Sequence, residues 1–598
     1  MKLCIQSMMR CVRTWICTQR TADTKWDRIV NVTLMSLFPF LLVILTELNH
    51  LQSFGALWAF LTEHFGVFLL DAIMLGLLFF ALTALMRRAW IAATVLGGFF
   101  YLLSCVEFFK YDVSRSHFLP ADMALAGNLG DVAGMAKLYL TAFLIVDLLV
   151  LAASVLVFWL RNCNLTVRIS QRLLTAAICL VCVTVAIVTP LSSVLYGFFG
   201  LDQREAVSTF TANVKFKNNR LLAFWISELS QMAQSGLSAP KGYSQESIGA
   251  LLASAEKPLA ENLQAHNVII VMSESYGDFR ALSSSVGDLA YEAFDAMMSE
   301  GFGGTAVVPT FGGYTVRSEF ELIAGLPSAS LKDPVEPHRV IKRETVEAIP
   351  ALFADLGYKT FYLHPYAADF YDRDTVYPTF GFDTLLFEDS FAGGERTRYG
   401  RADDAVCFEK TVEIIAETEE PTFLFVTTMQ NHQPYYYESD HNVDEMTFYM
   451  EGIAETDRAL EDFHAALDAL GEPTILLYVG DHLPFFGLEG NFYEEYGYGE
   501  ENYDALYRQS YLIYANYELD GRAVPQEEIS LFYLPHLLMQ LAVSDSVPTV
   551  SAAIWNHAES VPVYTTVCMP NERAADPFLD AITYDRVIGA AYSANPLY

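Results

Sequence analysis

Cysteine is scarce in this 598-residue sequence: there are nine in all, and only Cys407 and Cys568 lie beyond residue 200. Small secreted scaffolds that depend on disulfides need many closely spaced cysteines, so this class of protein is excluded. One disulfide between those two residues stays open, because pairing cannot be deduced from spacing alone.

Basic residues are also few after residue 200. Residues 1–200 hold 14 Lys and Arg against 10 Asp and Glu, whereas residues 201–598 hold 23 against 61. So acidic a region has no electrostatic attraction for nucleic acid, which we exclude as a partner. The chain as a whole is nevertheless 53% hydrophobic, with a mean hydropathy of +0.27. These two properties together predict two regions that face different solvents.

Long apolar runs are concentrated in the first third of the chain. Each is close to the roughly 20 residues that cross a bilayer. They occupy residues 29–45, 67–86, 90–109, 138–160 and 173–191. We therefore predict a cytoplasmic N-terminal tail (1–28), a five-helix transmembrane domain (29–191), a connector (192–265) and an extracellular domain (266–598). Within the connector, Arg220–Ile226 is predicted as an interfacial helix on the membrane surface.

The distribution of Lys and Arg predicts the orientation in the membrane. The tail and the loops after the second and fourth apolar runs carry 11 basic residues, against 3 in the loops after the first and third. By the positive-inside rule the N-terminus is cytoplasmic, and five crossings place everything after Leu191 outside the cell. The protein is thus expected in the cell membrane, in a multi-pass arrangement.

Three apolar runs after residue 265 end in polar residues. Runs 267–272, 422–426 and 474–479 read as buried strands, and a fourth lies near 358–363. They alternate with helical patterns such as 447–470, which predicts an α/β domain with a mostly parallel central sheet. The residues that follow three of these strands include Glu274, His432, Asp481 and His482.

Carboxyl ends of parallel strands meet at one edge of a sheet, where ligands bind. Carboxylate and imidazole groups are good ligands for divalent metals. The sequence therefore predicts a metal site at this edge.

A candidate nucleophile follows Gly312-Gly313-Tyr314. Thr315 precedes an amphipathic segment and would lie at the N-terminus of a helix, where the positive field favours a phosphate. A bound metal would lower the pKa of its hydroxyl. A structural role is open as well: Thr315 or Ser318 would serve as a helix N-cap, and Ser318 with Glu321 fits a capping box. The two roles are compatible.

Five short motifs give the chain a resemblance to lipoteichoic acid synthases of the sulfatase and alkaline-phosphatase superfamily, over about residues 265–540. They occur in the order found in that family. The motifs are Ser-Glu-Ser at 273–275, Gly-Tyr-Thr-Val-Arg-Ser-Glu-Phe at 313–320, Phe-Tyr-Asp-Arg-Asp at 370–374, Asn-His-Gln-Pro at 431–434 and Gly-Asp-His at 480–482.

The resemblance implies a membrane-anchored, sulfatase-like transferase with one divalent metal, Mn²⁺ before Mg²⁺. It implies Thr315 as the nucleophile and a metal held by Glu274, Thr315, Asp481 and His482. It also implies substrate contacts at Arg373 and His432, with Tyr371, His364 and Asn431 as further substrate-binding candidates. The family often has Trp where this chain has Tyr371, which leaves the fit to a glycerol head group open.

The function expected from this resemblance is metal-dependent transfer of glycerophosphate. The donor would be phosphatidylglycerol of the membrane. The acceptor would be a growing lipoteichoic acid chain on a glycolipid anchor, and the intermediate a covalent adduct on Thr315.

Two other functions remain open. One is a phosphoethanolamine transferase that modifies lipid or glycan, and the other is a catalytically silent membrane scaffold or sensor. A true sulfatase would need a Cys or Ser in a Cys/Ser-x-Pro-x-Arg context, which Thr315 and its neighbours do not offer.

Overall fold

The computed structural model describes two compact units, which we treat separately. The first comprises Met1–Ala206 with Thr211–Gly236, and the second comprises Leu237–Tyr598 with Val207–Phe210. The structure describes residues 25–594 except for 115–116, 121, 124–140, 165–166, 190, 205–208, 235–237, 254, 256–264, 282–289, 332–336, 342, 392–400, 436–443, 487–491, 500, 520–527, 544–545 and 568–574. Cys568 lies outside these residues, so the disulfide with Cys407 stays untested.

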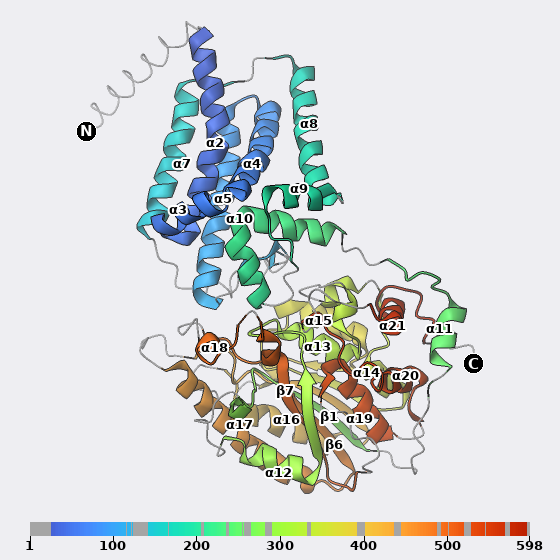
Figure 1. Ribbon diagram of the computed structural model, residues 1–598. Coiled ribbons are helices and arrows are strands. Elements are labelled where there is room, and N and C mark those ends of the chain that lie inside the picture. The colour runs from blue at the N-terminus through green and yellow to red at the C-terminus, as the bar shows by residue number, and fades with distance from the viewer. Residues whose placement is uncertain are drawn as a thin grey trace. The chain divides into compact units, whose positions relative to one another are not determined.

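The first unit is a bundle of apolar helices (Figure 1). Within the described residues, five helices are long and apolar enough to cross a membrane, as predicted. Many of their large apolar side chains are exposed on the unit's surface, as lipid-facing side chains would be. The helices are α2 (Lys25–Leu51), α4 (Phe65–Met86), α5 (Ala89–Ser114), α7 (Ala142–Leu160) and α8 (Ile169–Val188), with short α3 (Phe54–Glu63) and α9 (Leu191–Phe199).

The first unit extends further along the chain than the predicted transmembrane domain. Helix α10 (Thr209–Gln234) is kinked at Arg220 and packs largely within this unit. Leu221 and Phe224, in the segment predicted as an interfacial helix, are both fully buried in the unit's apolar core. The segment is therefore covered by protein on more than one face, and its position at a membrane surface stays a prediction.

The second unit is built on one eight-stranded sheet, in the order β4-β3-β5-β1-β6-β7-β2-β8 (Figure 1). The sheet is mostly parallel, as predicted, and β7 is antiparallel to both of its neighbours. The four predicted strands are its centre, whereas the others had no clear sequence signal. The strands are β1 (Asn267–Ser273), β2 (Phe302–Val307), β3 (Lys359–Leu363), β4 (Thr384–Leu386), β5 (Thr422–Thr427), β6 (Thr474–Gly480), β7 (Arg508–Ala515) and β8 (Glu528–Ser530).

Helices lie on both faces of this sheet (Figure 1). Every residue of β1, β5 and β6 is buried, which explains why these strands read as continuous apolar runs. The predicted helix 447–470 is α17, displaced by two residues. The helices are α11 (Gln245–Leu252), α12 (Glu292–Glu300), α13 (Thr315–Ala324), α14 (Ile349–Asp355), α15 (Arg373–Val376), α16 (Asp404–Glu417), α17 (Glu445–Asp468), α18 (Phe492–Glu495), α19 (Leu534–Val543), α20 (Thr549–His557) and α21 (Pro577–Val587).

Candidate active site and metal centre

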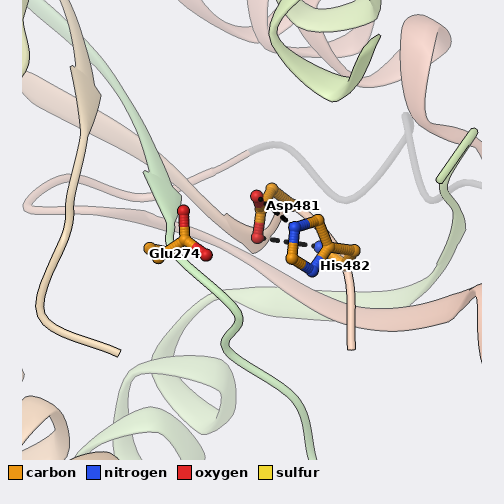
Figure 2. Close-up of side chains that lie close together, drawn as sticks. All are labelled: Glu274, Asp481 and His482. Carbon is orange, nitrogen blue, oxygen red and sulfur yellow. Dashed lines mark hydrogen bonds and ion pairs between the residues drawn. The ribbon is translucent and has the colours of Figure 1, made fainter. Parts of the chain in front are cut away.

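The register of two central strands brings the predicted acidic ligands together. Strands β1 and β6 are parallel neighbours, and Ser273 at the end of β1 pairs with Gly480 at the end of β6. Glu274 and Asp481 are the next residues in each chain segment, so they leave the sheet side by side. Figure 2 shows both carboxylates with the ring of His482 at this edge.

Glu274, Asp481 and His482 form a buried group with the geometry of a metal site. One ligand atom from each lies within 4.8 Å of the other two. Asp481 is held in place by its Oδ1, which accepts hydrogen bonds from the backbone N–H of Ser275 (2.7 Å) and of His482 (2.9 Å). Its other oxygen, Oδ2, lies 3.1 Å from His482 Nε2.

The imidazole of His482 is oriented as a metal-binding imidazole would be. Its Nδ1 lies 2.9 Å from the Leu483 carbonyl oxygen, so Nδ1 carries the proton and Nε2 presents a lone pair. Within the described part of the chain, neither Nε2 nor Asp481 Oδ2 has a hydrogen-bond partner, since their close approach lacks hydrogen-bond geometry. Two buried, unsatisfied ligand atoms are what a divalent cation would satisfy. The residues present therefore fit a metal.

The electrostatics of the group point to the same fit. Burial, together with the nearby Asp481, raises the pKa of Glu274 to about 7. Burial also raises the pKa of Asp481 to about 7 and lowers that of His482. Two carboxylates that lie side by side in the interior lose their hydration and repel one another when ionised. A bound divalent cation would offset both the lost hydration and the repulsion.

Thr315 lies beside this group, at the start of helix α13. Its Oγ1 is 3.4 Å from Glu274 Oε2, so the side chain faces the acidic group. Tyr314 supplies the turn into the helix from a left-handed conformation, with φ of 59°. Thr315 is thus the first helical residue and not the N-cap.

The predicted capping box of Ser318 and Glu321 is wrong. Ser318 lies inside α13, where its Oγ donates to the Asp481 backbone oxygen at 2.7 Å. Glu321 instead accepts from the backbone N–H of Ser328 at 3.0 Å and from its hydroxyl at 2.7 Å. The helix begins three residues before Ser318, so the serine links α13 to the end of β6.

Arg373, predicted to contact substrate, is fully buried in an ion pair. Its Nη2 lies 3.0 Å from Glu319 Oε2, and its Nε donates to the same oxygen at 3.1 Å. The ring of Tyr371 lies 5.1 Å from the guanidinium carbon, within reach of a cation–π contact. The two residues therefore lie together, and the contact of either one with a substrate stays a prediction.

Three further predicted residues occupy the region after β3 and β5. His364 is buried with its Nδ1 3.1 Å from the Thr427 carbonyl oxygen, and burial lowers its pKa to about 3. The Nδ1 of His432 lies 2.6 Å from the Gln433 carbonyl oxygen. Burial and the charge of Arg401 lower the pKa of His432 to about 3 as well. Both rings are neutral at physiological pH.

Asn431 behaves differently from the two histidines. Its Nδ2 donates to Thr456 Oγ1 at 2.9 Å, so its amide ties the loop after β5 to helix α17. Contact of Asn431 with a substrate stays a prediction.

Two residues near the site were not predicted from the sequence. Glu319 follows Thr315 by one helical turn and receives hydrogen bonds from Tyr362 and Tyr377 as well as from Arg373. Arg401 donates to the backbone oxygens of the segment after β5. Glu319 belongs to the motif at 313–320. The sequence of that motif does not indicate that Glu319 pairs with an arginine.

Three comparisons show which known proteins the chain resembles. Residues 266–544 match the family model "Sulfatase". A capsular polysaccharide biosynthesis protein of Rhizobium meliloti (strain 1021) is 27% identical over 246 residues, covering 40% of this chain and 45% of that protein. A lipoteichoic acid synthase of Staphylococcus saprophyticus is 24% identical over 253 residues, covering 38% of this chain and 36% of that protein.

A solved structure also matches the chain. The phosphoglycerol transferase GacH of Streptococcus pyogenes, in complex with sn-glycerol-1-phosphate, is 21% identical with a TM-score of 0.47, covering 60% of this chain and 97% of that one. The chain spans less than half the length of the curated relatives it matches. The resemblance predicted from the five motifs is confirmed by the match to a lipoteichoic acid synthase. The chain therefore carries a domain of the sulfatase and alkaline-phosphatase superfamily, preceded by five apolar helices long enough to cross a membrane.

Proposed function

We propose that the protein is a metal-dependent phosphotransferase that moves glycerophosphate from phosphatidylglycerol to a growing polyglycerolphosphate chain of lipoteichoic acid. The observation that carries this proposal is the position of Thr315. Its hydroxyl lies at the N-terminus of α13 and faces Glu274, beside the buried ligand atoms of Asp481 and His482. A hydroxyl placed next to a metal group and a helix N-terminus is suited to attack a phosphodiester.

The reaction is an exchange of phosphodiesters in two steps. In the first, Thr315 Oγ1 loses its proton and bonds to phosphorus, the bond to the diacylglycerol oxygen breaks, this oxygen takes up a proton and diacylglycerol leaves, so that glycerophosphate stays on the threonine. In the second, the terminal hydroxyl of the acceptor loses its proton and bonds to phosphorus, the bond to Thr315 Oγ1 breaks, and the threonine oxygen takes its proton back. A divalent ion held by Glu274, Thr315, Asp481 and His482 would supply positive charge to the threonine oxygen and to the phosphoryl oxygens.

The chain's own side chains supply positioning and proton acceptors. The Thr315 hydroxyl proton is directed at Glu274 Oε2, 3.4 Å away. His432 uses its Nδ1 proton on a carbonyl oxygen, which leaves Nε2 as an acceptor for a hydroxyl proton of the incoming substrate. A neutral His432 cannot donate a proton from Nε2, so its role belongs to the second step.

The apolar helices in the same chain support a lipid donor. An anchored site meets phosphatidylglycerol at the surface of the bilayer, and the diacylglycerol product stays in the bilayer. The positive-inside pattern supports a cytoplasmic N-terminus and an extracellular catalytic domain in the cell membrane. The two carboxylates and one imidazole suit Mn²⁺ or Mg²⁺, and the family resemblance favours Mn²⁺.

Mass spectrometry of the full chain in detergent tests the proposal. The protein is incubated with Mn²⁺ and phosphatidylglycerol, digested, and searched for an adduct of glycerophosphate mass. We expect the adduct on Thr315 and its absence from Thr315→Ala, whose folding is checked by circular dichroism. Thr447→Ala serves as the matched control, since Thr447 is an exposed threonine of the same unit, on α17, and should leave the adduct in place.

Other outcomes would assign a different function. An adduct of ethanolamine phosphate that forms only with phosphatidylethanolamine would identify this lipid as the donor. The protein would then be a phosphoethanolamine transferase. A folded, metal-bound protein that forms no adduct with either lipid would overturn the proposal and leave the scaffold or sensor as the function.

A further inference from the structure

Helix α9 (Leu191–Phe199) exposes large apolar side chains and buries polar ones. The exposed fractions of Leu191, Val194 and Phe198 are 59%, 68% and 82%. Ser192 and Tyr196 of the same helix are buried. A short helix that faced water would show the reverse distribution, because apolar surface is unfavourable in water. The exposed face of α9 therefore fits an apolar environment.

Hydrogen bonds hold the polar side chains of α9 against the rest of the first unit. The Tyr196 hydroxyl donates to the Ala186 carbonyl oxygen of α8 at 2.7 Å. Ser192 Oγ lies 3.1 Å from Ser230 Oγ of α10. Both contacts are buried, and together they fix the rotation of α9 about its own axis. This rotation keeps the three large apolar side chains of α9 exposed.

Helix α3 (Phe54–Glu63) also exposes large apolar side chains. Phe54 is 68% exposed and Trp58, one turn later, is 69% exposed. Leu57 and Phe60 of the same helix are buried in the core of the bundle. Tryptophan is enriched where a bilayer meets water, because its ring contacts the acyl chains while its N–H reaches polar groups. Trp58 therefore suits the same environment as the exposed face of α9.

Helices α3 and α9 lie at the same end of the bundle. Helix α3 follows the first membrane-length helix and α9 follows the fifth, and two odd-numbered crossings end on the same side. A close contact supports this placement: a Cβ at Gly66, the second residue of α4, would lie 2.3 Å from the Phe199 carbonyl oxygen at the end of α9. In Figure 1, both short helices lie across the direction of the long ones.

The exposed faces of these short helices continue the lipid-facing surface of the long ones. Helix α8, which leads into α9, exposes Leu174, Ile178 and Val181. We propose that α3 and α9 lie in the interface between lipid head groups and acyl chains, at the membrane surface that the positive-inside pattern places outside the cell. The bilayer itself covers their exposed apolar side chains. Helix α9 then fixes the point at which the chain leaves the bilayer, a role that the sequence had suggested for Arg220–Ile226.

Nitroxide-labelled lipids test the proposal with the full chain in vesicles of phosphatidylcholine and phosphatidylglycerol. A fluorescent amino acid replaces Phe198 in one variant and Trp58 in another, so that the test survives if one variant does not fold. The nitroxide is attached to the acyl chain either near the head group or near the methyl end. We expect the nitroxide near the head group to cause the larger loss of fluorescence at both positions, because interfacial side chains lie at that depth.

Two further positions make the test specific. Ile178 lies in the middle of α8, so a fluorescent residue there should lose more fluorescence to the nitroxide near the methyl end. Tyr496 is an exposed aromatic residue of the second unit, and a fluorescent residue there should lose little fluorescence to either lipid. If Phe198 and Trp58 behave like Tyr496, α3 and α9 lie in water or beneath protein, and the proposal is overturned. Behaviour like that of Ile178 would also overturn it, since both helices would then lie in the hydrocarbon core.

Discussion

Glu319 and Arg373 form an ion pair in the interior of the second unit, with Arg373 Nη2 3.0 Å from Glu319 Oε2. The pair joins α13, which begins with Thr315, to α15. The Thr427 hydroxyl at the end of β5 donates to the other oxygen of Glu319 at 2.8 Å. Although burial opposes ionisation, the charge of Arg373 lowers the pKa of Glu319 to about 2. The glutamate is therefore ionised, and it holds the guanidinium beside α13.

Glu319→Gln should destabilise the second unit strongly. The substitution leaves the buried charge of Arg373 without its counter-charge, a loss that costs about 3–5 kcal/mol in buried pairs. Denaturant unfolding followed by circular dichroism measures it. Glu413→Gln is the control, since Glu413 pairs with Lys410 at an exposed site where loss of the pair costs about 1 kcal/mol or less. Equal effects of the two substitutions would contradict the role assigned to Glu319.

Removal of divalent metal should lower the Tm of the second unit, and Mn²⁺ should restore it. A ligand that binds only the folded state stabilises that state by mass action. Asp481→Asn should abolish the response, because the amide cannot supply the charge that the site needs. Asp468→Asn is the control in the exposed cluster Glu300, His464 and Asp468, which also has metal-ligand spacing. If the response were lost in Asp468→Asn and kept in Asp481→Asn, the metal would bind at the exposed cluster and not at the buried group.

Gly480→Ala should disturb the metal group through the backbone. A Cβ at this position would lie 2.0 Å from the Tyr276 carbonyl oxygen, so β6 or the segment after β1 must move. We expect a loss of at least about 1–3 kcal/mol in the free energy of unfolding, together with weaker Mn²⁺ binding by calorimetry. Gly471→Ala, whose Cβ would meet nothing within 4 Å, should change the free energy by about 0.5 kcal/mol or less. Unchanged Mn²⁺ affinity in Gly480→Ala would show that the site tolerates the shift.

The stability of the second unit should depend on Asp576 at neutral pH and not in acid. Asp576 is the N-cap of α21, where it accepts from the Leu579 N–H at 2.8 Å and lies 2.9 Å from His557 Nε2. Burial by itself raises the pKa of Asp576, but these hydrogen bonds outweigh burial and lower the pKa. A lowered pKa adds stability above the unfolded value of about 3.9, and this stability is lost as pH falls through the folded value.

Asp576→Ala should therefore lose about 1–2 kcal/mol at pH 7, and the difference from wild type should shrink as the pH falls below about 4. Asp576→Asn should recover part of the loss, because Asn also caps a helix. Unfolding free energies measured across this range of pH provide the check. A difference that stays constant down to the lowest pH would rule out the ionised cap as its source.

The local pattern of apolar residues in the sequence determined much of the fold of this protein. Strands buried on both faces must be apolar throughout, so β1, β5 and β6 were visible as runs that stop at Ser273, Thr427 and Gly480. Membrane-length helices are equally visible, since a bilayer requires about 20 apolar residues in succession. Because parallel strands share one edge, the meeting of Glu274 with Asp481 followed from the sequence as well.

Only the tertiary structure decided which partners the polar groups take. The start of α13 at Thr315, rather than at Ser318, depends on Tyr314 entering a left-handed conformation against its surroundings. The pairing of Glu319 with Arg373 joins residues 54 positions apart. Periodicity records which face of an element is buried, but not which residue from elsewhere in the chain will meet it there.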